Sequence, residues 1–485
     1  MQNACMRFLG SLVVVVMLIT ACGGSDSAEL EASSDEIVVL NATARLTPAE
    51  VFSAVSPSVV FINMPSGTGS GVLLSSGYVV TSAHVVGHYP TVQLFTSAGE
   101  LAEVPVYAKD WSTDLALIGP LPFDDLDGEI PALDVGSSAT VAIGDDVYLI
   151  GYPGEVERQP SPTMTSGILS RRRLTPCLDM TFLQTDAMLA PGQSGGVLVD
   201  VSGQVIGISG LGGFTESNFA LVLTAEDVSA AIEELDEGSG SLASTERPGV
   251  LKQSAGVASY DSVGYLVTIT EDQPLLSVTA RSATGEDVWL NIHTSDGFEP
   301  IWHWPQGEVD YIYDSDEKET GWFHADAFDD STGESLEVSL EPDMYVVSTG
   351  TYSGRRTTIV VEASRPLSLL EDEEPSYGSL AMGESVTGLL SHSEDLDSYR
   401  IDLQKGDTVR IQVVSIADPV MSLYLDDVLV ASSDDAGIGL YGDGAEIVFE
   451  ANVAGQYDLE VMALAMFPSS YALTFDHADS GKPSC

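Results

Sequence analysis

Short apolar runs rich in valine, isoleucine, leucine and phenylalanine recur along the first half of the chain, each bounded by glycine, serine or proline. Runs of this kind between turn residues are typical of β-strands. We expect strands at 59–62, 69–74, 78–81, 91–95, 104–109, 115–118, 146–150, 163–169, 181–184, 196–199 and 205–209. Because no long segment of helical period separates them, the pattern predicts an all-β fold, built as a barrel or a pair of barrels.

Helical spacing flanks this β region. Thr47 is expected to cap a short helix, with Pro48 in its first position and Glu50 completing a capping box. At the other end, apolar residues at helical spacing predict a helix over 226–235 that docks on the barrel. These two helices mark the limits of a first globular domain at 44–236.

Alternating apolar and polar positions return in the second half of the chain. They predict two further β-rich segments, 254–364 and 376–477, which look like a diverged repeat. The segments 237–253 and 365–375 are expected to be linkers, and 478–485 a tail. A chain of 485 residues is long enough for these three domains.

The N-terminus has the pattern of an export signal over residues 1–21. Arg7 supplies a positive charge, and the apolar run 8–19 is too short to span a membrane. The run ends in Leu18-Ile19-Thr20-Ala21-Cys22, which resembles the bacterial lipoprotein box, in which the cysteine is lipidated. A plain signal peptide cut near Ala21 is the alternative. Lipidation of Cys22 would anchor the protein at a membrane, with 22–43 as a flexible acidic tether.

The chain is strongly acidic, with 18 lysines and arginines against 73 acids and a formal net charge of −55. Such a surface repels the phosphates of nucleic acids and anionic lipid headgroups, so neither is an expected partner. A solvated acidic surface suited to a salty or extracellular setting explains the charge.

The four cysteines do not form a disulfide framework. Cys5 leaves with the signal, and Cys22 is committed to lipid. Cys177 and Cys485 then either pair or stay as free thiols, and we favour free thiols.

Candidate chemistry begins at Ser194, in the glycine-rich stretch 192–196. A tight turn there can present its hydroxyl and the neighbouring N–H groups to one substrate atom. A nucleophilic serine also needs a base and a group that orients the base. His84 follows a predicted strand among small and apolar neighbours, and Asp114 opens the apolar strand 115–118. Alone, each is more simply a core histidine or a loop-end acid. In the order His, Asp, Ser, they indicate a catalytic triad with His84 as the base.

Six motifs in this region resemble, in order and spacing, trypsin-like serine proteases of the HtrA (Deg) type. They are Gly67-Thr68-Gly69-Ser70-Gly71-Val72, Thr81-Ser82-Ala83-His84-Val85-Val86, Asp114-Leu115-Ala116-Leu117, Gly151-Tyr152-Pro153, Gln184-Thr185-Asp186-Ala187 and Gly192-Gln193-Ser194-Gly195-Gly196. The resemblance runs from Thr47 to Leu235. It implies two six-stranded β-barrels, as in chymotrypsin and trypsin, with the triad of His84, Asp114 and Ser194 in the cleft between them.

The resemblance also implies an oxyanion hole and a specificity pocket. The hole is expected to consist of the backbone N–H groups of Gly192, Gln193 and Ser194, with Gln193 where the family usually has asparagine. Met188 is expected to form the pocket floor, with Ser209-Gly210-Leu211 as its wall. An apolar floor without an acid favours small or medium apolar side chains over lysine or arginine.

Arg171-Arg172-Arg173 falls where the family has a regulatory loop. An exposed loop that offsets nearby acids is the favoured interpretation. An activation or substrate-docking loop is the functional alternative.

After the protease region we find no PDZ signature. The segment 376–477 instead resembles the bacterial pre-peptidase C-terminal (PPC) domain, and 254–364 matches it weakly. The motifs are Asp395-Leu396-Asp397-Ser398-Tyr399, Lys405-Gly406-Asp407-Thr408, Ser432-Ser433-Asp434-Asp435 and Ala454-Gly455-Gln456-Tyr457. Such domains are jelly-roll-like β-sandwiches, and the resemblance implies substrate or surface binding.

Two groups of side chains in these segments are weak candidates for binding. Asp395, Asp397, Asp434 and Asp435 have the oxygen ligands that Ca²⁺ takes, but solvated turn acids are the favoured interpretation. The aromatic stretches 302–304 and 322–324 form either a binding patch or, as we favour, sandwich core.

Together these patterns predict a lipid-anchored serine endopeptidase at the cell envelope, in the periplasm or on the outer surface, that cleaves exported or misfolded proteins through an acyl-enzyme. No cofactor is expected apart from Ca²⁺ at the weak site. The expected partners are protein or peptide substrates and a membrane, and the oligomeric state is left open. A non-catalytic surface-binding lipoprotein on a protease scaffold is the alternative. The presence of His84, Asp114 and Ser194 argues against it.

Overall fold

The computed structural model describes residues 45–478, except 66, 123–129, 155–159, 176–177, 213–218, 237–245, 248–249, 255–261, 283–287, 295–321, 326–332, 352–357, 371–377, 391–394, 417, 427, 435, 437–443 and 464–467. The chain divides into two compact units, Met1–Ala44 and Arg45–Cys485, and the first lies outside the described residues. The export signal, the lipidated Cys22 and the tether therefore stay predictions. Cys177 and Cys485 lie outside the described residues as well. No helix of the described part is long and apolar enough to cross a membrane.

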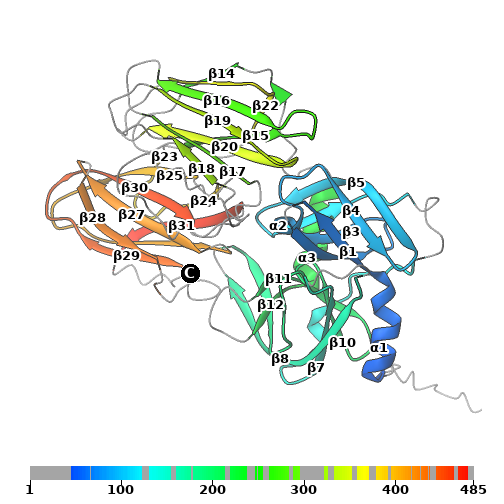
Figure 1. Cartoon of the computed structure of the whole chain (residues 1–485). Coiled ribbons are helices and arrows are strands. Elements are labelled where there is room, and N and C mark those ends of the chain that lie inside the picture. Colours follow the sequence, from blue (N-terminus) through cyan, green and yellow to red (C-terminus); the bar gives the residue numbers. More distant parts are fainter. Residues whose placement is uncertain are drawn as a thin grey trace, which may run out of the picture. The chain divides into compact units, whose positions relative to one another are not determined.

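Six strands close into a first barrel in the order β1-β2-β3-β6-β5-β4 (Figure 1, blue to cyan). They are β1 (Val59–Met64), β2 (Gly67–Leu73), β3 (Val79–Ser82), β4 (Thr91–Thr96), β5 (Gly99–Asp110) and β6 (Leu115–Ile118). Val60, Ile62, Leu73 and Leu94 are among the aliphatic side chains that fill its core. Burial of each such side chain contributes about 1.5–3 kcal/mol, which is what draws these short strands together. A single helical turn, α2 (Ala83–Val86), follows β3 directly.

A second closed barrel has the order β10-β11-β12-β9-β8-β7. Its strands are β7 (Asp146–Gly151), β8 (Thr163–Thr175), β9 (Met180–Thr185), β10 (Val197–Asp200), β11 (Val205–Gly212) and β12 (Ala220–Thr224). Leu149, Leu183 and Val222 lie in its core. Val72 and Leu117 of the first barrel share one further apolar cluster with Ile150 and Val197 of the second, so the two barrels pack together.

Two longer helices flank the barrels, α1 (Pro48–Val55) and α3 (Ala225–Asp236). The predicted capping box is confirmed, because the Thr47 N–H donates to Glu50 Oε2 over 2.8 Å and the Glu50 N–H donates to Thr47 Oγ1 over 3.4 Å. The helix predicted over 226–235 is confirmed as α3. The described residues of this region also form the short 3₁₀ turns η1 (Ser56–Ser58) and η3 (Ser138–Thr140).

Beyond the barrels, a six-stranded sheet of order β13-β22-β15-β20-β17-β18 accompanies a four-stranded sheet of order β14-β21-β16-β19. The strands are β13 (Glu246–Arg247), β14 (Val250–Ser254), β15 (Ser262–Thr268), β16 (Leu275–Ser282), β17 (Val288–Thr294), β18 (Trp322–Ala325), β19 (Gly333–Ser339), β20 (Met344–Thr351), β21 (Thr358–Ala363) and β22 (Leu367–Leu369). One apolar core takes side chains from both sheets, including Tyr265 and Val278, so they form a β-sandwich.

The last segment contains a five-stranded sheet of order β23-β25-β30-β27-β28 and a four-stranded sheet of order β24-β31-β26-β29. The strands are β23 (Gly378–Ser379), β24 (Ser385–Leu390), β25 (Asp397–Leu403), β26 (Thr408–Ser415), β27 (Pro419–Leu425), β28 (Val428–Ser433), β29 (Ala445–Glu450), β30 (Gly455–Ala463) and β31 (Ser469–His477). A second shared core, with Ile401 and Leu473 among its members, makes this segment a sandwich too.

Eight strands of each sandwich are arranged in the same order. The orders β15-β20-β17-β18 and β14-β21-β16-β19 of the first recur as β25-β30-β27-β28 and β24-β31-β26-β29 in the second. Equal pairing of strands in the same chain order supports the interpretation of these segments as a diverged repeat. The predicted all-β class is confirmed, while the domain boundaries and the PPC assignment stay predictions.

Candidate active site

His84 and Asp114 meet where two strands of the first barrel end. His84 lies in α2, and its Nδ1 is 2.7 Å from Asp114 Oδ2. The backbone N–H of His84 donates to Asp114 Oδ1 over 2.9 Å, so both carboxylate oxygens are bound by the same residue. The His84 and Asp114 side chains are only 15% and 6% exposed. A carboxylate at Nδ1 favours the tautomer with its proton on that nitrogen, which leaves Nε2 as an acceptor.

The backbone of Asp114 is held in an unusual conformation. Its φ is +55°, a left-handed value that costs a residue other than glycine free energy, although aspartate tolerates it better than most. The Ala83 N–H donates to the Asp114 carbonyl over 2.9 Å and helps to hold this geometry. A Cβ at Gly210, on the facing barrel, would lie 3.1 Å from Asp114 Oδ2, so a glycine leaves the carboxylate its space.

Ser194 lies in the loop between β9 and β10 of the second barrel. Its hydroxyl donates to the Gly210 carbonyl over 3.2 Å. This is long for an O–H···O hydrogen bond, so the hydroxyl can exchange it for another acceptor at little cost.

Hydrogen bonds fix every carbonyl of the loop from Pro191 to Ser194. The bonds are Gly154 N–H to Pro191 O at 2.7 Å, Ser70 Oγ to Gly192 O at 2.8 Å, Ser209 Oγ to Gln193 O at 2.7 Å and Ser70 N–H to Ser194 O at 2.8 Å. The C=O of one residue and the N–H of the next share one trans peptide and point in opposite directions, so the bonds to the Pro191 and Gln193 carbonyls also fix the directions of the Gly192 and Ser194 N–H groups. Within the described part of the chain, the Gly192 and Ser194 N–H groups have no hydrogen-bond partner.

Gln193 differs from its expected role. Its backbone N–H donates to Ala190 O over 3.0 Å, so this amide is used inside the loop. Its side chain is buried, accepts from the Ala190 N–H over 2.8 Å and donates to Thr163 Oγ1 over 3.1 Å. The expectation that the Gln193 N–H is an oxyanion donor is therefore corrected, while the N–H groups of Gly192 and Ser194 remain the predicted donors.

The expected floor of the specificity pocket is wrong. Met188 is 70% exposed, so its side chain does not close a pocket, while its neighbour Ala187 is buried in the second barrel. The Ser209 hydroxyl donates to the Gln193 carbonyl over 2.7 Å, and the wall expected from Ser209-Gly210-Leu211 stays a prediction. Leu211 pairs with Leu221 through its backbone, and its side chain lies outside the described part.

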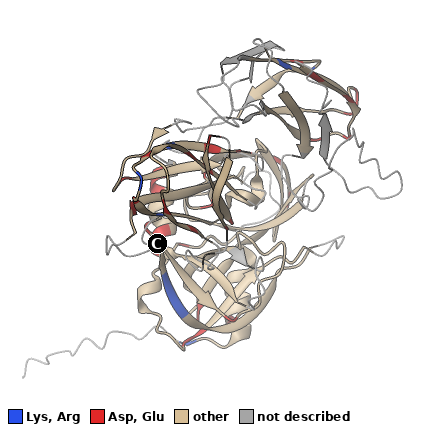
Figure 2. Ribbon diagram, turned by 90° about the vertical axis from the view of Figure 1, so that its left-hand side faces the viewer, with Lys and Arg blue, Asp and Glu red and all other residues tan. Residues whose placement is uncertain are grey.

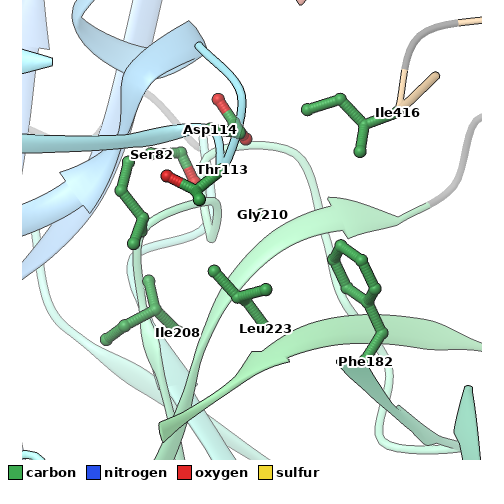
Figure 3. Close-up of a pocket in the computed structure, with 9 residues that line it drawn as sticks. Ser82, Thr113, Asp114, Phe182, Ile208, Gly210, Leu223 and Ile416 are labelled. Carbon is green, nitrogen blue, oxygen red and sulfur yellow. The ribbon is translucent and has the colours of Figure 1, made fainter. Parts of the chain in front are cut away.

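Residues of both barrels line a pocket beside Asp114, including Ser82 and Thr113 of the first barrel and Phe182, Ile208 and Leu223 of the second (Figure 3). Polar groups lie next to the carboxylate, and apolar side chains lie farther away. Apolar surroundings lower the local dielectric and strengthen the interaction of Asp114 with His84.

Arg171-Arg172-Arg173 lies in β8 and not in a loop, which corrects both interpretations of this cluster. The Arg172 guanidinium donates to Ser138 Oγ and Val141 O, each over 3.0 Å, and also to Ser138 O. Arg173 donates to Gln184 Oε1 over 2.8 Å. Arg171 is exposed. Figure 2 shows how few basic residues accompany the many acids of the described chain.

Among the described residues, the weak calcium candidates do not gather into a site. Asp395 and Asp397 are buried, and Asp397 Oδ2 accepts from the Tyr471 hydroxyl over 2.6 Å. Asp434 is exposed, and Asp435 lies outside the described residues. Within the described ranges, no group of three or more His, Cys, Asp or Glu side chains is placed to hold a metal ion. Of the aromatic stretches, 302–304 lies outside the described residues and 322–324 falls in β18.

Ser70 is the residue of this site to which sequence reasoning assigned no role. Both its hydroxyl and its backbone N–H reach the loop that contains Ser194. The signal was present in the motif 67–72, but a serine among glycines there is also what an ordinary turn contains.

Known proteins similar to this chain include serine proteases. Residues 69–208 match the trypsin-like peptidase domain family. The mouse protein "Serine protease HTRA4" is 35% identical over 181 residues, which cover 34% of this chain and 36% of that protein. The "Serine endoprotease DegS" of Salmonella typhimurium is 34% identical over 154 residues, covering 31% of this chain and 41% of that protein.

Among solved structures, "HtrA-type protease AlgW with tripeptide" is 28% identical, covers 42% of this chain and 68% of that one, and superposes with a TM-score of 0.35. The chain thus spans only about two fifths of the length of the curated relatives named above. Residues 69–208 thus match a trypsin-like peptidase domain and are similar in sequence to HtrA-type serine proteases.

Proposed function

We propose that this protein is a serine endopeptidase in which Ser194 is the nucleophile, His84 the general base and Asp114 the residue that orients His84. The observation that carries the proposal is the Asp114 carboxylate, because both of its oxygens are bound by His84. A buried acid shared with one histidine in this way fixes both the tautomer and the direction of the ring.

The geometry supports acyl transfer in two stages. His84 Nε2 takes the proton of the Ser194 hydroxyl as Oγ bonds to the carbonyl carbon of a peptide, and the carbonyl oxygen becomes an oxyanion. The free N–H groups of Gly192 and Ser194 stabilise that charge, and loss of one such donor costs about 10²–10³ in rate. His84 then gives the proton to the leaving amine as the C–N bond breaks. Water then bonds to the acyl carbon as His84 takes one of its protons, and His84 gives that proton to the Ser194 oxygen as the acyl C–O bond breaks.

The substrates we propose are exported or misfolded proteins, bound at the cleft between the barrels. The proposal includes a lipid anchor at Cys22 and C-terminal sandwiches that bind substrate or a surface. The first rests on the sequence of the export signal, and the second on the repeated β-sandwich topology. Replacement of Cys22 by alanine should release the protein from the membrane fraction and abolish incorporation of labelled fatty acid.

A serine-directed fluorophosphonate tests the proposed chemistry. The full-length protein should be labelled and should cleave an unfolded protein, and Ser194→Ala should do neither. Ser202→Ala is a matched control, since Ser202 lies in a turn of the same barrel where its hydroxyl bonds only to Asp200. If wild type is not labelled and does not cleave, the protein is a binding protein on a protease scaffold.

A further inference from the structure

Ser70 connects the first barrel to the reactive loop of the second. We infer that Ser70 is a positioning residue that holds residues 191–194, the oxyanion loop, in the conformation described above, an inference that rests on the function proposed above. Ser70 lies in β2 and is fully buried. The loop it contacts lies 122 residues farther along the chain, in the other barrel.

The hydroxyl of Ser70 has a defined direction. Its oxygen accepts from the Tyr152 N–H over 2.8 Å, and its proton is donated to the Gly192 carbonyl over 2.8 Å. With its oxygen accepting from one side and its proton donated on the other, the hydroxyl is fixed in place. The Gly192–Gln193 peptide is thereby held at its carbonyl by Ser70 and at its N–H by Ala190.

The backbone of Ser70 holds the other end of the loop. Its N–H donates to the Ser194 carbonyl over 2.8 Å, and its own carbonyl accepts from Thr81 Oγ1 over 2.6 Å. The fit leaves no room for a side chain at Gly195, since a Cβ there would lie 2.0 Å from the Ser70 carbonyl oxygen. Ser70 therefore bonds to the carbonyls of Gly192 and Ser194, which belong to the peptides that directly follow the two N–H groups proposed to bind the oxyanion.

This arrangement matters because a peptide can rotate about its flanking bonds. If the Gly192 carbonyl loses its donor, the Gly192–Gln193 peptide is less constrained. Because this peptide joins the Pro191–Gly192 peptide at the Gly192 Cα, the Gly192 N–H then points at the oxyanion for less of the time. Donors that stabilise a transition state must be held in place beforehand, and a displacement of about 1 Å can cost on the order of 10²-fold in rate. The hydroxyl of Ser70 is too deeply buried to contact substrate, so its effect passes through the loop.

The experiment compares Ser70→Ala with Ser58→Ala in the full-length protein. Ser58 is also a buried serine of the first barrel region, but among the described residues its hydroxyl has no hydrogen-bond partner. For Ser70→Ala we expect kcat on a peptide substrate to fall about 10- to 100-fold while KM changes less than about three-fold. The pH of half-maximal activity should not move, because the hydroxyl does not titrate and His84 and Asp114 are untouched. Ser58→Ala should match wild type in all three.

An unchanged kcat in folded Ser70→Ala overturns the inference. So does a loss in kcat accompanied by an equal rise in KM or by a shifted pH profile, because the effect would then act on substrate binding or on the His84–Asp114 pair. If Ser70→Ala does not fold, Ser70→Cys retains a weaker donor and should give a kcat below that of the wild type; an unchanged kcat in folded Ser70→Cys overturns the inference. A wild-type protein that neither cleaves nor reacts with fluorophosphonate would refute the proposed function instead.

Discussion

The protease barrels and the second sandwich each bury a carboxylate, but they treat it differently. In the barrels, Asp114 has both oxygens hydrogen-bonded by His84. In the sandwich, Glu460 of β30 is 7% exposed, and within the described part of the chain its Oε1 has no hydrogen-bond partner. Burial and the nearby Asp458 raise the pKa of Glu460 to about 7, while a hydrogen bond from Tyr424 acts in the opposite direction.

The two carboxylates show what each region requires of a buried acid. A buried charge is costly unless hydrogen bonds or an opposite charge compensate it. The barrels compensate Asp114 fully, which keeps the carboxylate and the imidazole in one geometry. The sandwich leaves Glu460 partly uncompensated, so this acid takes up a proton far more readily than an exposed one.

Replacement of Asp114, the acid with both oxygens hydrogen-bonded, should have the largest of the expected effects. Asp114→Asn keeps the shape of the side chain but removes its charge and favours the wrong histidine tautomer, so kcat should fall about 10⁴-fold with the fold intact. Steady-state kinetics and a thermal melt measure the two effects. Asp200→Asn is the control, because this acid accepts turn hydrogen bonds from Ser202 and Gln204 away from His84. If Asp114→Asn keeps a kcat within about ten-fold of wild type, the barrels do not depend on a charged, hydrogen-bonded acid at this position.

A smaller effect is expected at Arg172, whose guanidinium is hydrogen-bonded in the second barrel. Arg172→Met removes the guanidinium donor from the carbonyls of Ser138 and Val141, of which the Ser138 carbonyl keeps the Val141 N–H, and should lower the free energy of unfolding by about 1–3 kcal/mol. Arg171→Met should change stability little, because Arg171 is exposed. Denaturant melts compare the two variants. A loss of activity in both, with unchanged stability, would contradict a structural role and support an activation segment.

The smallest effect concerns Glu460 and depends on pH. Its pKa is 4.5 when unperturbed and about 7 in the folded protein, so between these values the folded state binds more protons than the unfolded state. The free energy of unfolding contributed by this group should therefore fall as pH rises through that window and stay low above it. Glu460→Gln should abolish this dependence and raise the melting temperature of the sandwich above pH 7, where the exposed Glu450→Gln should not. A Glu460→Gln melt that still falls over this range would show that another group causes the dependence.

Much of the fold follows from the sequence because the strands carry their own signal. Each of the expected strands overlaps an observed strand, and the capping box at Thr47 was readable from residue types alone. Strand β12 was missed because its run Ala220–Thr224 leads straight into α3, and a short apolar run before a helix has no periodicity of its own.

The site was predictable at the level of residue identity and not at the level of hydrogen bonding. His84 and Asp114 are brought together as the motifs indicated. That the Gln193 N–H turns to Ala190, or that Met188 faces solvent, depends on loop conformation. Contacts such as that of Ser70 with Gly192 join residues far apart in the chain, and no local pattern encodes them.

The hydrogen bond between Ser70 and Gly192 also bears on the stage of folding at which the proposed active site is completed. Because its two ends belong to different barrels, a chain in which each barrel has folded but the two have not docked lacks the support of the oxyanion loop. Contacts of such long range form late in folding. On the proposed function, peptidase activity would then arise only with the final docking step, and a partly folded chain could not digest itself or its neighbours.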